Sequence, residues 1–119
     1  MVDDELGPRE SFRMLLKDRF EVCTASNGEE GLARAREMDF AIVFLDVRMP
    51  GMDGIEVLGR LRQIRPELPV VIVTAYATME AASQAVEMGA LGSLVKPFTR
   101  RDVDRYVEMA LAADDSARP

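Results

Sequence analysis

The hydrophobic pattern of this chain alternates between two periods. Short apolar runs of strand length lie at residues 21–25, 41–45, 69–73 and 92–95. Between them, apolar residues recur at helical spacing, which predicts helices at residues 8–18, 26–37, 54–65, 78–88 and 99–111. Repeated βα units produce this alternation, and their strands pair in a parallel sheet with helices on both faces. We therefore predict an α/β fold, a three-layer doubly wound parallel sheet.

Each predicted helix has one apolar face that the sheet can cover. We expect these faces to bury Phe12, Leu15, Leu16, Leu32, Ala33, Ile55, Leu58, Leu61, Val103, Tyr106, Val107 and Leu111. Ser26 with Glu29, and Thr99 with Asp102, have capping-box spacing and predict two helix starts. Residues 112–119 are small, charged and unpatterned, so we predict a domain of residues 1–111 followed by a tail or linker remnant.

Polar side chains stand where the apolar runs end. Asp46 follows the run 43–45 and is itself followed by turn residues, while Asp3 and Asp4 follow Val2. Thr74 and Lys96 end two later runs in the same way. The carboxyl ends of parallel strands meet at one edge of an open α/β sheet, where ligands bind. These acids, a hydroxyl and an ammonium group can therefore form one site.

Composition limits the classes of function. The 119 residues suit a single domain, and a formal net charge of -6 argues against a nucleic-acid surface. Any DNA-binding output should therefore lie on another polypeptide or segment. Cys23 is the single cysteine, so no internal disulfide is possible, and we interpret it as a small buried hydrophobic residue. No run reaches the length of a membrane helix and no signal-peptide pattern is present, so we expect a cytoplasmic protein.

Four segments together resemble the receiver domain of bacterial two-component response regulators. They are Val-Asp-Asp-Glu at 2–5, Leu-Asp-Val-Arg-Met-Pro-Gly-Met-Asp-Gly at 45–54, Val-Thr-Ala at 73–75 and Val-Lys-Pro-Phe at 95–98. The likeness covers residues 2–111, and four short motifs in order after strand-like runs form a specific joint signal. Residues 73–80 further resemble receivers of the regulators that drive sigma-54 transcription. The resemblance implies a CheY-like, flavodoxin-like sheet with strand order 2-1-3-4-5.

The resemblance also implies a Mg²⁺ site. Asp4 and Asp46 would bind the ion directly, Asp3 directly or through water, and the main-chain carbonyl of Arg48 would supply a further oxygen. Crowded carboxylates repel one another unless a cation lies between them, and carboxylate oxygens suit Mg²⁺. The absence of histidine in the chain agrees with an oxygen-rich site.

By the same resemblance, Asp46 is the phosphoacceptor and takes a phosphoryl group from a histidine kinase. Lys96 would contact a phosphoryl oxygen, and the Thr74 hydroxyl would turn inward once the phosphate is present. Such a domain is not an enzyme: it promotes its own phosphorylation and slow dephosphorylation, and switches a protein-interaction surface. The implied partners are the kinase and an output domain or effector protein outside this chain.

Two departures from the family pattern leave alternatives open. Only Met1 and Val2 precede the acid pair, where the resemblance implies a central strand of about five residues. That strand is then truncated or rearranged, which predicts a weakened acid pair and a homodimer or strand-exchanged oligomer. Ser93 stands where an aromatic residue that moves with the threonine is expected.

Other functions therefore have to be weighed. A degenerate receiver could act as a phosphorylation-independent protein-binding or dimerisation module. A phosphatase with an aspartyl nucleophile is disfavoured, because Arg48 stands where such enzymes place a general acid. Each site residue taken alone could be an ordinary surface or turn residue.

Overall fold

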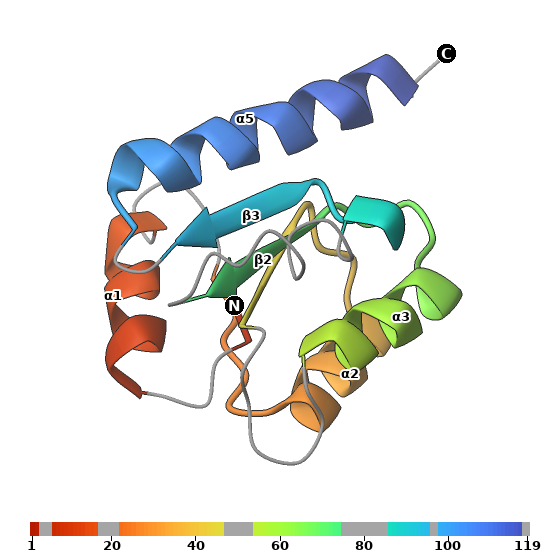
Figure 1. Cartoon of the computed structure of the whole chain (residues 1–119), viewed down its shortest axis with the longest axis horizontal. Helices are drawn as coiled ribbons and strands as arrows, with labels where there is room; N and C mark the ends of the chain where they lie inside the picture. The colour runs from red at the N-terminus through yellow and green to blue at the C-terminus, as the bar shows by residue number, and fades with distance from the viewer. Residues whose placement is uncertain (3–5, 17–21, 47–53, 75–85, 96–97, 118–119) are drawn as a thin grey trace.

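The computed structural model describes residues 1–2, 6–16, 22–46, 54–74, 86–95 and 98–117. Its helices and strands, in chain order, are α1 (Leu6–Leu16), α2 (Gly28–Glu37), β1 (Val43–Asp46), α3 (Gly54–Ile64), β2 (Val70–Thr74), β3 (Gly92–Val95) and α5 (Arg100–Ala117). Figure 1 shows the sheet between two layers of helices, with α1 and α5 on one face and α2 and α3 on the other. The predicted three-layer α/β architecture is confirmed.

The three named strands are parallel and stand in the order β1-β2-β3. Beyond β1, Val2 forms parallel bridges with both Leu45 and Ala25. Val2 therefore lies between residue 25 and β1, as the predicted order 2-1-3-4-5 requires. The predicted strand at 21–25 is wrong as a regular strand, because among its described residues only Ala25 forms a bridge. Its described neighbour in the sheet is Val2, which forms isolated bridges rather than a ladder.

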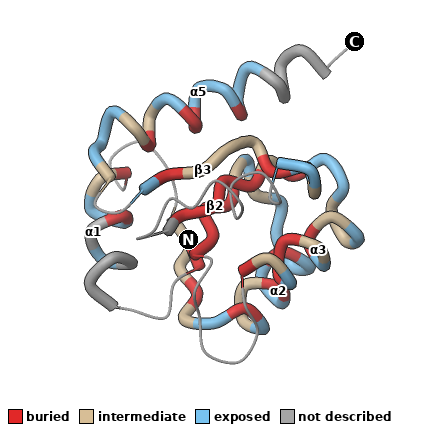
Figure 2. Tube along the Cα trace, viewed as in Figure 1, coloured by how far each residue is buried: buried red, intermediate tan, exposed pale blue. Residues whose placement is uncertain are grey.

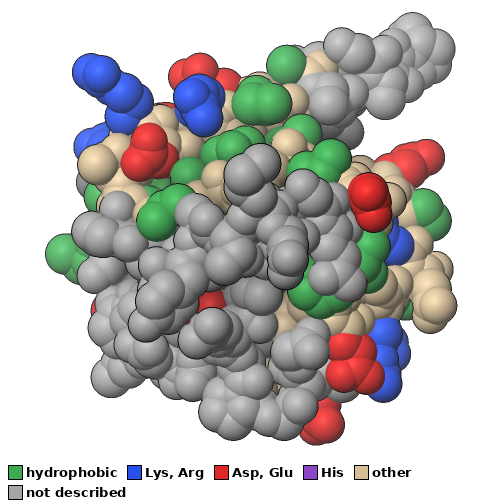
Figure 3. Space-filling model, viewed as in Figure 1, with side chains coloured by type: hydrophobic (Ala, Val, Ile, Leu, Met, Phe, Trp, Pro, Cys, Tyr) green, Lys and Arg blue, Asp and Glu red, His purple; other side chains and the backbone are tan. Residues whose placement is uncertain are grey.

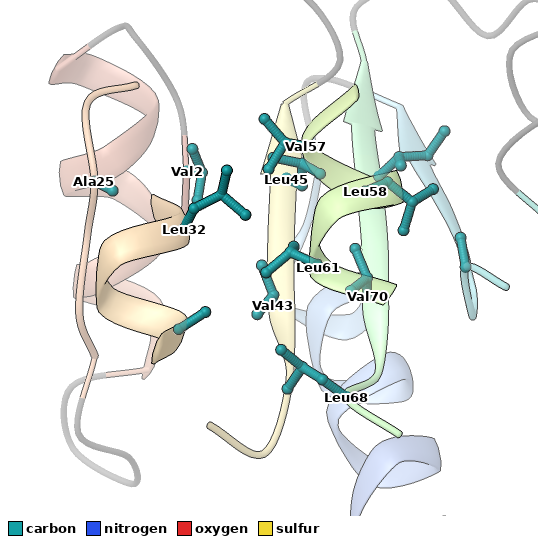
Figure 4. Close-up of a cluster of buried hydrophobic side chains, with 13 residues drawn as sticks. Val2, Ala25, Leu32, Val43, Leu45, Val57, Leu58, Leu61, Leu68 and Val70 are labelled. Atoms are coloured by element: carbon teal, nitrogen blue, oxygen red, sulfur yellow. The ribbon is translucent and has the colours of Figure 1, made fainter. Parts of the chain in front are cut away.

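The core consists of two clusters, one on each face of the sheet. Alternate residues of a strand point to opposite faces, so Leu45 packs with α2 and α3, whereas Phe44 packs with α1 and α5. Figure 2 shows the buried strands at the centre, and Figure 4 shows the cluster shared with α2 and α3. Burial on both faces explains why the strands read as continuous apolar runs.

The start of α2 corrects one capping prediction. Asn27, not Ser26, is the N-cap, and its side-chain oxygen accepts a hydrogen bond from Glu30 N at 2.8 Å. The Glu30 carboxylate in turn accepts bonds from the backbone and hydroxyl of Ser26. The cap is therefore shifted by one residue, and the Glu30 carboxylate bonds to the residue before the cap instead of to the cap itself. Asn is at least as good a cap as Ser, which allows this shift.

The start of α5 agrees with prediction, but its end does not. Thr99 and Asp102 exchange the two hydrogen bonds of a capping box, at 3.0 and 3.3 Å. The helix then continues to Ala117, six residues beyond the expected end. Leu111 is 38% exposed, and Ala110 takes the buried position instead.

Among the other predicted positions, Leu15 and Ile55 are only partly buried. Ala33 is exposed, and Ala35 is the small residue that α2 buries instead. The predicted helix at 78–88 falls mostly outside the described residues.

Candidate functional site

Asp46 is the last residue of β1 and is only 4% exposed. Among the residues that the structure describes, it is the one charged side chain in the buried class. Its backbone N–H donates to the carbonyl oxygen of Val2 at 2.9 Å. The buried run before it fixes the position, because three residues covered on both faces cannot shift without exposing apolar surface. A carboxylate is thereby held at the carboxyl edge of the sheet.

The neighbouring strands end at the same edge. Asp46 is in register with Val73, so Thr74 lies one residue further along β2. Thr74 is in register with Val95, the last residue of β3. The structure therefore brings the backbones of Asp46 and Thr74 together at the edge, as predicted. In the sequence, Lys96 directly follows Val95, the residue paired with Thr74.

The N-terminal residues also run toward this edge. Val2 N–H donates to the carbonyl oxygen of Phe44, and the bridge between Val2 and Leu45 is parallel. On the other side, α2 packs closely on Val2, since a Cβ built on Gly31 would lie 2.7 Å from a Val2 methyl carbon. Val2 is therefore fixed by backbone and side-chain contacts immediately before the acid pair of the sequence. The family resemblance placed a truncated central strand at Met1 and Val2, and the structure adds the individual backbone contacts of Val2.

The remaining predicted site residues cannot be placed. Asp3, Asp4, Arg48 and Lys96 lie outside the described residues, so their roles stay predictions. Within the described ranges, no three potential ligands are close enough together to hold a metal ion. The donor chemistry still fits Mg²⁺, because the carboxylate of Asp46 is the kind of hard oxygen ligand this ion prefers.

Tyr106 of α5 covers β3 at Ser93, where the family pattern has an aromatic residue. Its hydroxyl donates to the backbone oxygen of Ser93 at 3.2 Å. A side chain at Gly92 would meet the same ring, because a Cβ there would lie 2.5 to 2.8 Å from Tyr106 atoms. From its sequence pattern, Tyr106 was predicted only to be a core residue. The hydrogen bond shows that this aromatic side chain also holds β3, the strand that ends before position 96.

The amino group of Met1 is buried. It donates to the backbone oxygen of Cys23 at 2.7 Å. Loss of hydration lowers the pKa of this group from 8.0 to about 6, against a smaller raising effect from Cys23. Cys23 itself is only half-buried, which corrects the expectation of a fully buried side chain.

This lowered pKa predicts a pH-dependent stability. Between pH 6 and 8 the unfolded chain binds more protons at Met1 than the folded chain, so the free energy of unfolding should rise with pH. The expected gain across this window is on the order of 2 kcal/mol, and no histidine contributes because the chain has none. Urea denaturation at pH 6, 7 and 8 measures it. The Nα-acetylated protein is the control and should lose this rise, and an equal rise in both forms would assign it to another group.

The surface charges and the helices add two observations on the class of protein. On the face in Figure 3, the acidic and basic side chains drawn in colour are interspersed over the helices rather than gathered by sign. None of the helices in the described part of the chain is long and apolar enough to cross a membrane.

The chain is similar to known proteins over nearly its whole length. The model of a family described as the response regulator receiver domain matches residues 1–108. The chain is 37% identical over 113 residues to the transcriptional regulatory protein ZraR of Escherichia coli K12, a match covering 94% of this chain and 26% of ZraR. It thus spans about a quarter of the length of that relative.

Solved structures give the same result. The crystal structure of a response regulator receiver domain protein from Clostridium thermocellum superposes with a TM-score of 0.93 at 30% identity, covering 98% of this chain and 95% of that one. A chain of the CheX–CheY–BeF3–Mg²⁺ complex from Borrelia burgdorferi superposes with a TM-score of 0.87 at 26% identity, covering 92% of this chain and 85% of that one.

Proposed function

This chain belongs to the response regulator receiver domain family, and we propose that Asp46 is the residue on which it accepts a phosphoryl group. The observation that carries this assignment is a buried carboxylate fixed at the end of β1, beside the end of β2. The resemblance seen in the four sequence motifs is confirmed by the family match. The chain is thus a signalling domain, and the findings give no support to the degenerate alternative.

The proposed chemistry requires little beyond correct positioning. Asp46 would attack phosphorus in line with the bond to the leaving group, forming an acyl phosphate as that bond breaks. Burial of Asp46 limits the number of rotamers from which the attack can start. The backbone of Asp46 is held on both sides, by a hydrogen bond to Val2 and by the β1–β2 ladder, so the position of the attacking side chain is well defined.

A divalent cation fits this site. We assign Asp46, Asp4 and Asp3, with the main-chain carbonyl of Arg48, as the residues that would hold Mg²⁺. The bound ion would neutralise charge on the phosphoryl oxygens. A relative of this fold was crystallised with BeF3 and Mg²⁺, which supports the assignment.

Thr74 and Lys96 would respond to the phosphate. The Lys96 ammonium would contact a phosphoryl oxygen, and the Thr74 hydroxyl would donate to another. Since the phosphate interacts differently with the two arrangements of the segment after β2, it can change their populations. That change would alter a protein-interaction surface.

The proposed partners follow from this chemistry. A histidine kinase would supply the phosphoryl group in the cytoplasm, and an output domain or effector would recognise the phosphorylated form. Transcription regulation is the proposed output, since ZraR is a transcriptional regulatory protein.

Incubation with acetyl phosphate tests the proposal. We expect one phosphoryl group per chain by intact-mass spectrometry with Mg²⁺, and none when the ion is chelated. Peptide mapping should place the group on Asp46. Labelling at another residue would contradict the assignment, whereas binding of a protein partner without any labelling would restore the degenerate-receiver alternative.

A further inference from the structure

The connection between β3 and α5, which contains Lys96, begins and ends at fixed positions. On one side, β3 ends at Val95, which is in register with Thr74. On the other side, Phe98 packs against the core, and its ring lies 6.1 Å from that of Phe12. Only two residues separate Val95 from Phe98 in the sequence. A connection this short has little slack, so its course depends on how β3 and α5 are placed relative to each other.

The start of α5 is fixed as well. Thr99 N–H donates to the Asp102 carboxylate, and Asp102 N–H donates to the Thr99 hydroxyl oxygen, at 3.0 and 3.3 Å. This capping box orders the first turn of the helix, three residues after Lys96 in the sequence. A change in the direction of α5 would therefore reach the connection directly.

Tyr106 joins α5 to the backbone of β3. Figure 1 shows α5 alongside β3, and Tyr106 is 9% exposed in the core cluster that the two elements share. Its hydroxyl donates to the carbonyl oxygen of Ser93 at 3.2 Å. Ser93 is in register with Ile72, so the bond is made to a strand that the sheet already holds. It closes a loop of residues 93–106 that contains Lys96.

Gly92 gives the Tyr106 ring its place. Alternate residues of a strand point to the same face, so position 92 faces the same side as Leu94, which packs with α5. A Cβ at Gly92 would lie 2.5 Å from the Tyr106 hydroxyl oxygen and 2.6 to 2.8 Å from two ring carbons. The ring therefore occupies the space that a side chain at position 92 would need.

Arg105 favours the same position of the ring. Its guanidinium carbon lies 5.5 Å from the centre of the Tyr106 ring. A cation over an aromatic face is attracted by the electrons of the ring. With the strand backbone and the guanidinium both in contact with the ring, the hydroxyl is held as a donor to β3.

We propose that Tyr106 is a positioning residue for phosphoryl transfer: its hydroxyl holds Ser93 and thereby sets the end of β3 from which Lys96 reaches the phosphoryl group. This inference rests on the proposed contact of Lys96 with the phosphate. Tyr106 itself would touch neither the phosphate nor the metal ion, so its effect must pass through Lys96. Small displacements of a positioned group are enough to slow a reaction.

Tyr106→Phe tests the proposal because it removes the hydroxyl and keeps the ring. With acetyl phosphate and Mg²⁺, we expect the rate constant of labelling, followed by intact-mass spectrometry, to fall about threefold to tenfold, as for the loss of one neutral hydrogen bond. The Mg²⁺ concentration that gives half of the maximal rate should stay the same, because no proposed metal ligand lies on β3 or α5. A general loosening of the site would change both quantities.

Lys96→Met supplies the key comparison, because it removes the ammonium group and keeps a side chain of similar length. If Tyr106 acts through Lys96, Tyr106→Phe should slow labelling no further in the Lys96→Met protein. Losses that multiply in the double variant would show that Tyr106 acts by another route, which would overturn the proposal.

Val107→Ala is the matched control for stability. Val107 is the next residue of α5, is 4% exposed and belongs to the same core cluster, but its apolar side chain has no hydrogen bond to give β3. The truncation should lower the urea midpoint at least as much as Tyr106→Phe does, and it should leave the rate of labelling unchanged. An equal fall in rate in both variants would make Tyr106 a general contributor to stability and reject the positioning role.

The outcomes also separate this inference from the proposed function. Unchanged labelling of Tyr106→Phe, together with slow labelling of Lys96→Met, would reject the positioning role alone. Unchanged labelling of Lys96→Met would reject the contact of Lys96 with the phosphate, and the positioning role with it. Peptide mapping tests Asp46 separately, so neither result alters the assignment of the phosphoacceptor.

Discussion

Asp46→Asn is expected to reduce phosphoryl labelling by acetyl phosphate and Mg²⁺ to background, a loss of at least roughly a hundredfold. The amide has almost the same shape as the carboxylate, so it should fit the buried position at the end of β1. It has no negative charge, however, and is a poor nucleophile toward phosphorus. It also removes one of the charged oxygens that would hold the metal ion.

Asp39→Asn is the matched control for this loss. Asp39 is 88% exposed and pairs with Arg65 at 2.8 Å. Both residues precede the strands β1 and β2, whereas Asp46 lies at the carboxyl end of β1. The Asp39→Asn protein should be labelled like the unmodified protein. Circular dichroism should show that both variants are folded. Stoichiometric labelling of the Asp46→Asn protein would move the phosphoacceptor to another residue.

The position of Asp46 could be predicted from sequence because a buried strand leaves little freedom. Val43, Phe44 and Leu45 are covered on both faces, so the first charged residue after them must lie at the sheet edge. The same reasoning placed Thr74 at the end of β2. Strand ends in a parallel sheet are thus set by apolar runs, which are visible in the sequence.

The helix ends were less predictable because several residues compete for each position. Ser26 and Asn27 are both good N-cap residues, and in the structure Asn27 is the cap. The end of α5 shows the same effect. Residues 112–117 have no apolar pattern, yet they continue the helix, and three of the six are alanine, which has the highest helix propensity.

The N-terminal region could be derived from sequence only in part. The pattern at 21–25 reads as a strand, but strand formation depends on a partner of matching length. Val2 forms bridges with both Ala25 and Leu45, yet an apolar cavity remains beside it. The key contacts are backbone hydrogen bonds, for which side-chain patterns carry no information.

Phe44→Ala is expected to be the most destabilising single truncation that we predict, costing about 3–5 kcal/mol of the free energy of unfolding. Phe44 is 2% exposed, and its ring lies 4.7 Å from that of Phe12, so it joins α1 to the sheet. It also lines the cavity beside β1, so its removal would enlarge a space that the fold already leaves open. For a domain with a total stability of roughly 5–15 kcal/mol, such a loss is a large fraction.

Urea denaturation of the Phe44→Ala protein measures this cost. Met14→Ala on α1 is the control, because its side chain is 62% exposed and should change stability by less than about 0.5 kcal/mol. Since Phe44 stands two residues before Asp46, the remaining folded protein should also label more slowly with acetyl phosphate. A loss below about 1 kcal/mol would mean that neighbouring side chains collapse into the space, and that the contact between Phe44 and Phe12 is not what holds α1 against the sheet.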